Sequence, residues 1–420
     1  MTRPAPLADR TLLADPATYA RGVPRAEFRR RLRHAPVDWV EERPLDRRDG
    51  DRSRTEQGSG YWAVTRHASV TAASRDTRTF SSAARGAFLA DPRTPEQLHR
   101  TRQLLVSMDA PEHTRARRLI GNAFGPPAVR RLRGSIWEAA VKLVQRCRAR
   151  GEFDLVSDLA APLPLTVLAE VLGIPPEDRP LLLRWSNNLV GFDDPEYGGG
   201  DVEVYRSIFT EAFGYAADVA RQRRRAPADD IVSVLATAEA DGERLSDAEF
   251  GQLWLLLVVA GNETTRHAIS GGVQALLDHP DQLERLAADP GLLPSATEEI
   301  LRWTTPIMQF RRTLTRDATL DGTLMREGDK AVLYYIAANQ DDTVFTAPER
   351  FDITRDPNPH LAFGTGPHFC LGAALAREEI AVLLGALHPH LRRLRRAGEP
   401  VRLESNFMNG LKYFPVRFDD

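Results

Sequence analysis

The amino-acid sequence predicts a mainly helical protein that carries a few small β-sheets. Apolar residues recur at helical spacing over most of the chain after residue 113, whereas strand-like patterns are short and scattered. The longest apolar block, residues 253–260, is far short of the ~20 residues that span a bilayer and fits a buried helix. The predicted helices are residues 114–124, 129–150, 163–172, 202–225, 231–240, 247–277, 282–288, 295–304 and 373–387.

Strand signals occupy residues 37–40, 61–64, 331–336, 401–407 and 411–416. The Asn409-Gly410 pair predicts a hairpin turn between the last two of these runs. The polar segment 41–60 carries six acidic residues, five arginines and three glycines, so we expect a mobile loop there that buries little. The glycine run 198–200 predicts a flexible joint between two helices.

Composition excludes several classes of protein. The chain has 420 residues, of which 42% are hydrophobic, enough for a large core. Its net charge of −2 gives no electrostatic reason to bind nucleic acid. Two cysteines, Cys147 and Cys370, fit a reducing compartment better than a disulfide framework. Residues 1–25 contain neither the apolar core of a signal peptide nor a membrane-spanning run, so we expect a cytoplasmic protein without membrane insertion.

The most informative stretch is FGTGPHFCLG, residues 363–372, which places Cys370 in a glycine-rich loop before a predicted helix. Backbone N–H groups and the positive end of a helix stabilise a thiolate, and glycine lets the backbone approach without Cβ clashes. The pattern therefore predicts a thiolate ligand for iron, and the alternative is an inert buried cysteine. A dinucleotide fingerprint is rejected, because Phe369 occupies the third glycine position and no strand precedes the loop.

This stretch resembles the haem-ligand signature of the cytochrome P450 family, FGxGxHxCxG, at every fixed position. The resemblance implies haem b, iron protoporphyrin IX, as the cofactor and Cys370 as its axial iron ligand. A thiolate ligand donates electron density to iron and favours O–O cleavage. It also implies that Phe363 packs on the proximal haem face, that His368 lies near a propionate, and that Gly364 and Gly372 belong to the haem-binding loop.

The resemblance extends from about residue 36 to residue 418. It implies the cytochrome P450 fold, one large haem-enclosing unit over residues 36–420. Residues 1–35 are then an N-terminal extension.

Glu299 and Arg302 are three residues apart in a predicted helix and share one face. Taken alone, such a pair is commonly a solvated surface pair of little energetic worth. It reproduces the ExxR motif of the family, and the segment Pro348-Glu-Arg350-Phe351 matches the one that supplies a second arginine. The resemblance implies a buried network of Glu299, Arg302 and Arg350 that fixes the cysteine loop.

His113 and Arg117 are four residues apart and resemble the family's pair that faces a haem propionate. Donors on one helix face suit a carboxylate, and the alternative is a solvated basic helix. Arg312 aligns with the family's other propionate-binding arginine. A shift of the alignment by one residue would place Arg311 there instead.

The segment AGNETT, residues 260–265, follows an apolar run and resembles the acid–alcohol pair on the family's central helix. A glycine and a threonine hydroxyl can open a helical hydrogen-bond ladder for O₂ and water. The resemblance implies that Ala260 and Gly261 face the haem, that Thr264 orients bound oxygen, and that Glu263 relays protons. The alternative is a helical acid beside a packing threonine.

Substrate-contacting positions follow from the resemblance alone, and as a set they are apolar, which predicts a hydrophobic substrate. These positions are Phe88, Leu89, Trp185, Leu189, Phe192, Val259, Ile307, Met308, Phe407 and Met408.

The predicted function is that of a haem-thiolate monooxygenase that activates O₂ and hydroxylates a hydrophobic small molecule. The stretch 260–272 and the ending SNFMNGLK, residues 405–412, are similar to members acting on steroid-like, terpenoid or branched lipid substrates, and a secondary metabolite stays equally open. Ring closure or oxidative coupling at the same iron is an alternative, as is a non-catalytic haem gas sensor, although a sensor needs no proton relay. A structural helical protein with an inert Cys370 is a third alternative.

Without a fused flavin or iron–sulfur domain, electrons come from NAD(P)H through a separate ferredoxin and ferredoxin reductase. We expect a monomer that docks a small acidic ferredoxin on the Cys370 side, using arginines such as Arg115, Arg118 and Arg377.

Overall fold

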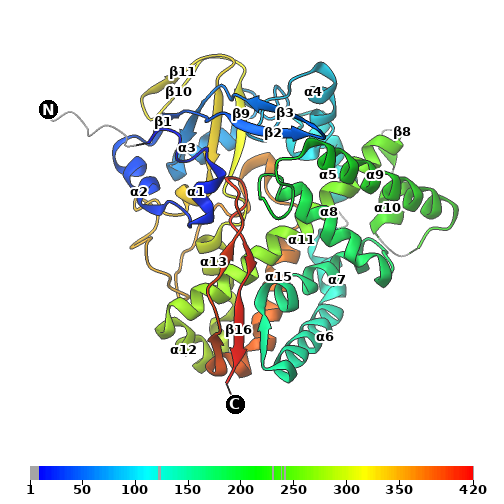
Figure 1. The fold of residues 1–420 in the computed structure, drawn as a ribbon, viewed down its shortest axis with the longest axis vertical. Helices are drawn as coiled ribbons and strands as arrows, with labels where there is room; N and C mark the ends of the chain where they lie inside the picture. The colour runs from blue at the N-terminus through cyan, green and yellow to red at the C-terminus, as the bar shows by residue number, and fades with distance from the viewer. Residues whose placement is uncertain (1–8, 122–123, 229–230, 238, 241–242, 420) are drawn as a thin grey trace.

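The computed structural model describes residues 9–121, 124–228, 231–237, 239–240 and 243–419, and it confirms a mainly helical fold with small sheets (Figure 1). The helices are α1 (Pro16–Ala20), α2 (Arg25–His34), α3 (His67–Arg75), α4 (Pro95–Arg102), α5 (Glu112–Gly121), α6 (Pro126–Arg150), α7 (Pro162–Val171), α8 (Arg179–Val190), α9 (Val202–Arg225), α10 (Ile231–Thr237), α11 (Asp247–Asp278), α12 (Pro280–Ala288), α13 (Leu293–Thr304), α14 (Tyr335–Ala338) and α15 (Ala373–Leu387).

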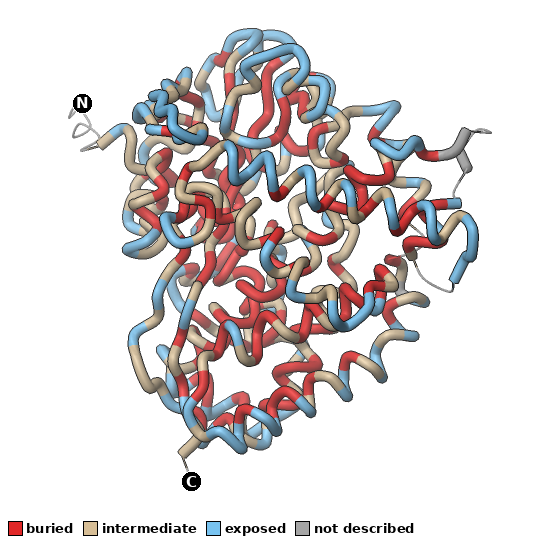
Figure 2. The backbone as a smooth tube through the Cα atoms, turned by 45° about the vertical axis from the view of Figure 1, so that its right-hand side comes forward, coloured by how far each residue is buried: buried red, intermediate tan, exposed pale blue. Residues whose placement is uncertain are grey.

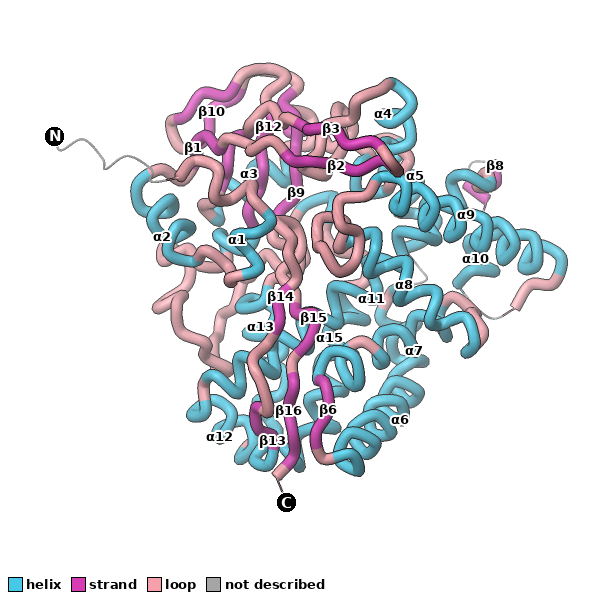
Figure 3. The backbone as a smooth tube through the Cα atoms, viewed as in Figure 1, coloured by secondary structure: helices cyan, strands magenta, loops and turns pink. Residues whose placement is uncertain are grey.

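The strands are short and lie mostly at one end of the molecule and along its C-terminal segment (Figure 3). They are β1 (Val37–Val40), β2 (Leu45–Asp49), β3 (Arg52–Glu56), β4 (Tyr61–Val64), β5 (Phe80–Ser81), β6 (Glu152–Asp154), β7 (Glu239–Ala240), β8 (Glu243–Arg244), β9 (Gln309–Leu314), β10 (Ala318–Leu320), β11 (Thr323–Met325), β12 (Lys330–Tyr334), β13 (Leu394–Arg396), β14 (Val401–Arg402), β15 (Leu411–Tyr413) and β16 (Pro415–Phe418).

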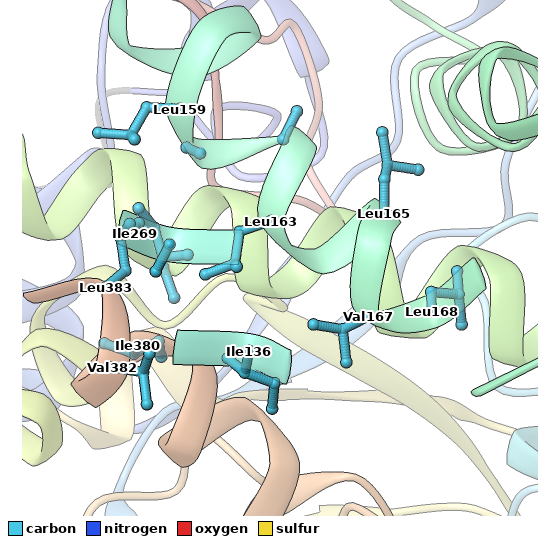
Figure 4. Close-up of a cluster of buried hydrophobic side chains, with 14 of the residues drawn as sticks. Ile136, Leu159, Leu163, Leu165, Val167, Leu168, Ile269, Ile380, Val382 and Leu383 are labelled. Atoms are coloured by element: carbon cyan, nitrogen blue, oxygen red, sulfur yellow. The ribbon is translucent and has the colours of Figure 1, made fainter. Parts of the chain in front are cut away.

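Helix α11 runs through the centre of the helical part. Ser246 and Glu249 form a capping box at its start, each side chain bonding the backbone N–H of the other. Its apolar residues pack against α7, α8, α9, α13 and α15, so it is buried on most of its surface. Figure 4 shows this core, where Leu163 of α7, Ile269 of α11 and Leu383 of α15 lie close together. Figure 2 shows buried residues concentrated along these central helices.

The largest sheet has the strand order β1-β4-β12-β9-β5, with β12 parallel to β4 and the other pairs antiparallel. Alternate residues of β12 pack into different hydrophobic cores, because successive side chains of a strand point to opposite faces of the sheet. Val332 and Tyr334 join the core shared with α1 and α2, whereas Ala331 and Leu333 join the core shared with α3. The sheet is therefore covered on both faces.

Residues of the expected N-terminal extension take part in the first of these cores. Leu13, Tyr19 and Phe28 are buried, and they pack with Tyr61 and Tyr334 of the sheet. The described part of this extension thus belongs to the same folded unit as the sheet.

The polar segment 41–60 forms the β2–β3 hairpin, where the sequence predicted a loop that buries little. Arg47 is buried and pairs with Asp193 in the segment between α8 and α9. The Glu42 carboxylate accepts from the Lys330 ammonium at 2.9 Å. Charged side chains of the segment therefore pair with residues far away in the sequence. The polar composition of the segment does not indicate these contacts.

The glycine run 198–200 is tied into a turn by backbone hydrogen bonds. The Gly200 N–H donates to the Phe192 carbonyl oxygen at 2.7 Å, and the Arg48 N–H donates to Gly200 at 3.2 Å. A Cβ on Gly198 would lie 2.6 Å from the backbone of Phe192, so close packing explains this glycine. The predicted joint between two helices is confirmed in place.

Element boundaries differ from prediction at helix and strand ends: α5, α6, α12 and α13 begin earlier than predicted, and α8 was not predicted. Helices α9 and α15 have the predicted bounds, whereas α10 stops at Thr237. Strand β12 ends at Tyr334, because the next four residues form α14. The predicted C-terminal hairpin is confirmed, but its first strand is only Val401–Arg402. Predicted residues 122 and 123 of the first helix lie outside the described residues. No helix in the described ranges is long and apolar enough to cross a membrane.

Candidate active site

The predicted cysteine loop folds back so that Cys370 faces a cavity beside α11. The Cys370 N–H donates to the Phe363 carbonyl oxygen at 2.9 Å. Gly364 and Gly366 have φ of 67° and 73°, the left-handed region that glycine adopts without a Cβ clash. A Cβ on Gly366 would lie 2.8 Å from the Ser74 carbonyl oxygen. The backbone therefore requires glycine at both positions.

Opposing effects set the pKa of the Cys370 thiol. Burial raises the pKa, while the Gly372 N–H and the charges of Arg117 and Arg377 lower it, and burial is the larger effect. The net pKa is raised, so the backbone and the helix do not by themselves produce the predicted thiolate. The side chain is open to the cavity, and a metal ion deprotonates a thiol that coordinates it. A thiolate at Cys370 would therefore need a bound metal ion.

The cavity beside Cys370 is walled mainly by apolar side chains from α5, α7, α11 and α15 and from the segment after α13. A Cβ built on Gly372 would meet no protein atom within 4 Å, so the loop leaves open space at this glycine. The predicted residues that line this cavity are His113, Arg117, Ala260, Gly261, Thr264, Ile307, Phe363, Gly364, His368, Cys370 and Gly372.

Buried nitrogen groups gather at one side of the cavity. The rings of His113 and His368 are 4.2 Å apart, and the His113 Nε2 is buried without a hydrogen-bond partner. Arg312 is 1% exposed, and its Nε also lacks a partner. Arg117 lies in the same group and donates to the Phe369 carbonyl oxygen at 2.6 Å. Buried donors without acceptors are rare in proteins, so this set fits a cofactor that brings carboxylates.

The same group is strongly electropositive. Burial, together with Arg117, lowers the pKa of His113 to about 4. Burial, Arg312, His113 and Arg117 lower the pKa of His368 to about 2. Arg311 faces the other way and pairs with Asp91 at 2.8 Å, because neighbours on a strand point to opposite faces. The structure therefore places Arg312, and not Arg311, beside His368.

Thr264 lies on the cavity side of α11. Its hydroxyl donates to the Ala260 carbonyl oxygen at 2.6 Å. Helix α11 is continuous through this point, so the opened hydrogen-bond ladder suggested by the sequence is absent in this conformation. A Cβ on Gly261 would lie 3.2 Å from Leu168 of α7, so the glycine allows the two helices to approach closely.

Glu263 points away from the cavity and into a buried polar cluster between α11 and α8. Its carboxylate accepts from Ser186 at 2.8 Å and from Asn262 at 3.1 Å, and it pairs with Arg266. Burial favours the protonated acid, but Arg266, His267 and Ser186 outweigh it and lower the pKa. Glu263 is thus an ionised, fully paired side chain outside the described lining of the cavity, and no direct proton path to Thr264 is formed.

The predicted network around Glu299 exists, with one different member. Glu299 and Arg302 are both buried and form two hydrogen bonds, at 2.7 and 2.8 Å. The second arginine is Arg355, whose Nε donates to Glu299 at 3.1 Å. Arg350 is exposed and contributes only its carbonyl oxygen, which accepts from Arg302 at 3.1 Å. The prediction of Arg350 was wrong, because a motif match does not show which side chain of a loop turns inward.

This network holds the chain that leads into the cysteine loop. Asn358 donates to Glu299 at 3.1 Å, and the Leu361 N–H donates to Asn339 at 2.6 Å. Nearby, Arg377 forms two bonds to Glu298 and lies 4.5 Å from the centre of the Phe363 ring. The predicted place of Phe363 beside the cysteine is therefore supported by packing with α15.

Most predicted substrate positions lie away from the cavity wall. Phe88 and Phe407 form an edge-to-face trio with Phe310, which does line the cavity. Trp185, Met308 and Met408 are buried core residues, and their prediction as pocket positions was wrong. Family alignment marks regions, whereas the orientation of a side chain depends on packing. The remaining positions, Leu89, Leu189, Phe192 and Val259, are partly buried and are absent from the described lining.

Sequence reasoning missed several residues of the cavity. Leu253, Leu256 and Leu257 line it from α11, one or two turns before Ala260, a spacing that could have revealed them. Glu379 of α15 also lines it, with a buried Oε2 that lacks a partner. Burial raises the pKa of Glu379 well above its ordinary value, so this carboxyl is neutral. No local pattern distinguishes it from a surface glutamate.

Comparison with known proteins agrees with this site. The cytochrome P450 family model matches residues 291–395, which include Glu299, Arg302 and Cys370. The chain is 37% identical to the cytochrome P450 CYP268A2 of Mycobacterium marinum in complex with pseudoionone, with a TM-score of 0.88 and coverage of 100% of this chain and 99% of that one. The chain belongs to the cytochrome P450 family.

Two curated relatives are similarly close to this cytochrome P450. The steroid C26-monooxygenase of Rhodococcus jostii is 41% identical over 408 residues, covering 96% of this chain and 84% of that protein. The methyl-branched lipid omega-hydroxylase of Mycobacterium tuberculosis is 42% identical over 364 residues, covering 86% and 84%. The P450 fold, a haem iron cofactor and the oxidoreductase class of a monooxygenase therefore hold for this chain.

The network around Glu299 leads to a prediction. Replacing Arg355 by leucine should lower the free energy of unfolding by about 2–3 kcal/mol, because bonds to a buried carboxylate and to three carbonyl oxygens are lost. The variant should also retain less haem. Urea unfolding and haem content per chain measure both effects.

Arg350→Leu is the matched control, with a change within ~0.5 kcal/mol, because its side chain is exposed. Equal losses in the two variants would contradict the assignment of Arg355.

Proposed function

We propose that this cytochrome P450 hydroxylates a hydrophobic small molecule of the steroid or methyl-branched lipid class. The observation that carries the proposal is the cavity itself, whose wall around Cys370 and Thr264 is made largely of leucine, isoleucine, valine and phenylalanine side chains. Two relatives with more than 40% identity are named for a steroid and a methyl-branched lipid. A substrate with an alkyl branch would leave no polar group unpaired in such a cavity.

The residues present fit the haem. Cys370 would bind the iron, since it lines the cavity. His113, Arg117, Arg312 and His368 would hold the two propionates, because the unpaired buried nitrogens of His113 and Arg312 and the charges of the two arginines suit anionic partners. When bound, the thiolate-ligated haem supplies the activation of O₂.

On the opposite side of the cavity, Thr264 is the hydroxyl that would hold a proton near the reacting oxygen. Its present acceptor is the Ala260 carbonyl oxygen, so the hydroxyl can turn from donor to acceptor by breaking one bond. The buried pairing of Glu263 with Arg266 and Ser186 must open before this acid can exchange protons with the cavity. We propose that Glu263 supplies a proton to Thr264 only after this pairing has opened.

A spectral experiment tests the substrate class. Protein produced with ample haem should show, when reduced and treated with CO, the long-wavelength band of a thiolate-ligated haem, and Cys370→Ser should lose it. Steroids and methyl-branched lipids should then displace water from the ferric iron, whereas small aromatic metabolites should not. Binding confined to the aromatic metabolites would overturn the proposed class.

The assigned role of Thr264 leads to a second prediction. Thr264→Ala should bind haem and ligand normally yet release a several-fold larger share of reducing equivalents as hydrogen peroxide, because the hydroxyl that holds the proton is gone. NAD(P)H consumption, product and peroxide are measured together. Thr264→Ser keeps the hydroxyl and should stay coupled, and tightly coupled turnover of the alanine variant would contradict the role.

We also propose that a small acidic ferredoxin, reduced by NAD(P)H through a ferredoxin reductase, delivers the electrons. The three arginines named from the sequence differ in their freedom to bind it. Arg377 is bound to Glu298, and Arg115 lies 3.5 Å from Glu249, whereas Arg118 of α5 is exposed. Arg118 follows Arg117, whose guanidinium lies beside the cysteine loop, so it is the best placed of the three.

Arg118→Glu should slow reduction by an acidic ferredoxin about tenfold at low salt and weaken its dependence on ionic strength, since one attractive charge becomes repulsive. Stopped-flow reduction at several salt concentrations measures this. Arg221→Glu on α9 is the control and should be unaffected. An unchanged rate for Arg118→Glu would remove the proposed docking site.

A further inference from the structure

Three aromatic side chains from three different helices meet behind α11. Trp185 of α8, Tyr215 of α9 and Trp254 of α11 form an aromatic triad with ring centres 5.4 to 5.8 Å apart in every pair. Each ring therefore contacts both others, in tilted or edge-to-face geometry. Trp185 was predicted from its sequence position to line the substrate pocket, a role that its burial in this triad excludes.

Packing alone explains the triad poorly. Trp185 and Trp254 are 1% and 0% exposed, and neither indole N–H has a hydrogen-bond partner. A buried donor without an acceptor destabilises the folded state, a cost that phenylalanine or leucine would avoid at the same positions. Two indoles with this cost in one cluster point to a property that other apolar side chains lack. The property that distinguishes indole and phenol rings is that they lose an electron readily.

Tyr215 connects the triad to the protein surface. Its hydroxyl donates to the Asp178 carboxylate at 2.7 Å, and both residues are partly exposed. Burial, and after it the hydrogen bond to Asp178, raise the pKa of Tyr215 well above its ordinary value, so the phenol keeps its proton in the resting protein. A phenol that loses an electron becomes a strong acid, and here an acceptor for its proton is already hydrogen-bonded to it. Removal of an electron from Tyr215 is thereby favoured.

The inner end of the triad lies within one helix width of the cavity. Leu257 lines the cavity and is one turn of α11 from Trp254, whose ring packs against Trp185 of α8 and Tyr215 of α9. An α-helix with its side chains is about 10–12 Å across. Electrons cross a gap of that order between redox centres on a catalytic timescale. The triad thus runs from behind the cavity wall to a surface carboxylate.

We propose that the aromatic triad carries oxidising equivalents from the haem site to the surface when no substrate hydrogen is available, an inference that rests on the proposed function. One electron leaves Tyr215 and passes through Trp254, directly or by way of Trp185, to the haem centre oxidised by peroxide. The Tyr215 proton moves to Asp178. A one-electron reductant of the thiol or ascorbate class then reduces the tyrosyl radical, and Asp178 returns the proton.

The test uses the haem-loaded, substrate-free enzyme mixed with hydrogen peroxide and frozen within milliseconds. Electron paramagnetic resonance should detect a tyrosyl radical, which Tyr215→Phe should remove. Haem bleaching under peroxide should become several-fold faster in that variant, with haem content and the CO spectrum unchanged. Tyr205→Phe, on the same helix but outside the triad, is the control and should match the parent. Trp254→Phe should lower the radical yield without changing the ligand-induced spectral shift.

An unchanged radical signal or bleaching rate in Tyr215→Phe would overturn the inference. Failure of the proposed function has a different signature, namely absence of the CO band or of any ligand-induced shift in the parent enzyme. A tight-binding steroid or branched lipid should also suppress the radical, since substrate hydrogen then consumes the oxidising equivalents. A radical that persists undiminished with such a ligand would equally contradict the inference.

Discussion

The buried carboxylate of Glu299 is the contact on which the geometry of the site depends. An ionised carboxylate removed from water must be paired and fully hydrogen-bonded, and Glu299 accepts from Arg302, Arg355, Asn358 and the Asp352 N–H. These donors come from α13 and from the segment that leads into the cysteine loop. One charge therefore ties that segment to the helical core, and the position of the Cys370 sulfur follows from it.

Helix α11 shows a second constraint, which separates the two residues of the acid–alcohol pair. Successive residues of an α-helix point about 100° apart, and this step places Glu263 beyond the edge of the helix face that lines the cavity, while Thr264 lies within it. Thr264 takes the cavity side together with Ala260 and Leu257. Glu263 takes the side that packs on α8, where Arg266 and Ser186 pair with it. The proposed proton delivery by Glu263 therefore requires motion of a side chain whose ion pair is fully buried.

The sequence could predict those structural features that depend on residues close together in the chain. Helical periodicity located α9 and α15, and the spacing of Glu299 and Arg302 implied their contact. The glycines around Cys370 were required by backbone conformation, which a short motif records. These features need no knowledge of distant segments.

The predictions that were wrong concern features that depend on contacts between residues far apart in the chain. Arg355 was missed in favour of Arg350 because only the folded loop decides which side chain turns toward Glu299. The β2–β3 hairpin was missed because Arg47 finds its partner at Asp193, far along the chain. Trp185 was misplaced because the partners that bury it belong to α9 and α11. Each depends on contacts between remote segments, which composition and periodicity do not encode.

The donors near His368 connect cofactor binding with stability. His113 and Arg312 are buried with nitrogen atoms that have no acceptor, and burial together with the charges of Arg117 and Arg312 keeps both histidines neutral. Such an arrangement costs free energy in the protein alone. Two carboxylates at this place would satisfy the donors and offset the charges of Arg117 and Arg312, so the bound cofactor stabilises the folded chain by mass action. Haem binding at this cluster would for this reason be coupled to folding, because the two arginines and the unpaired nitrogens match a group that carries two carboxylates.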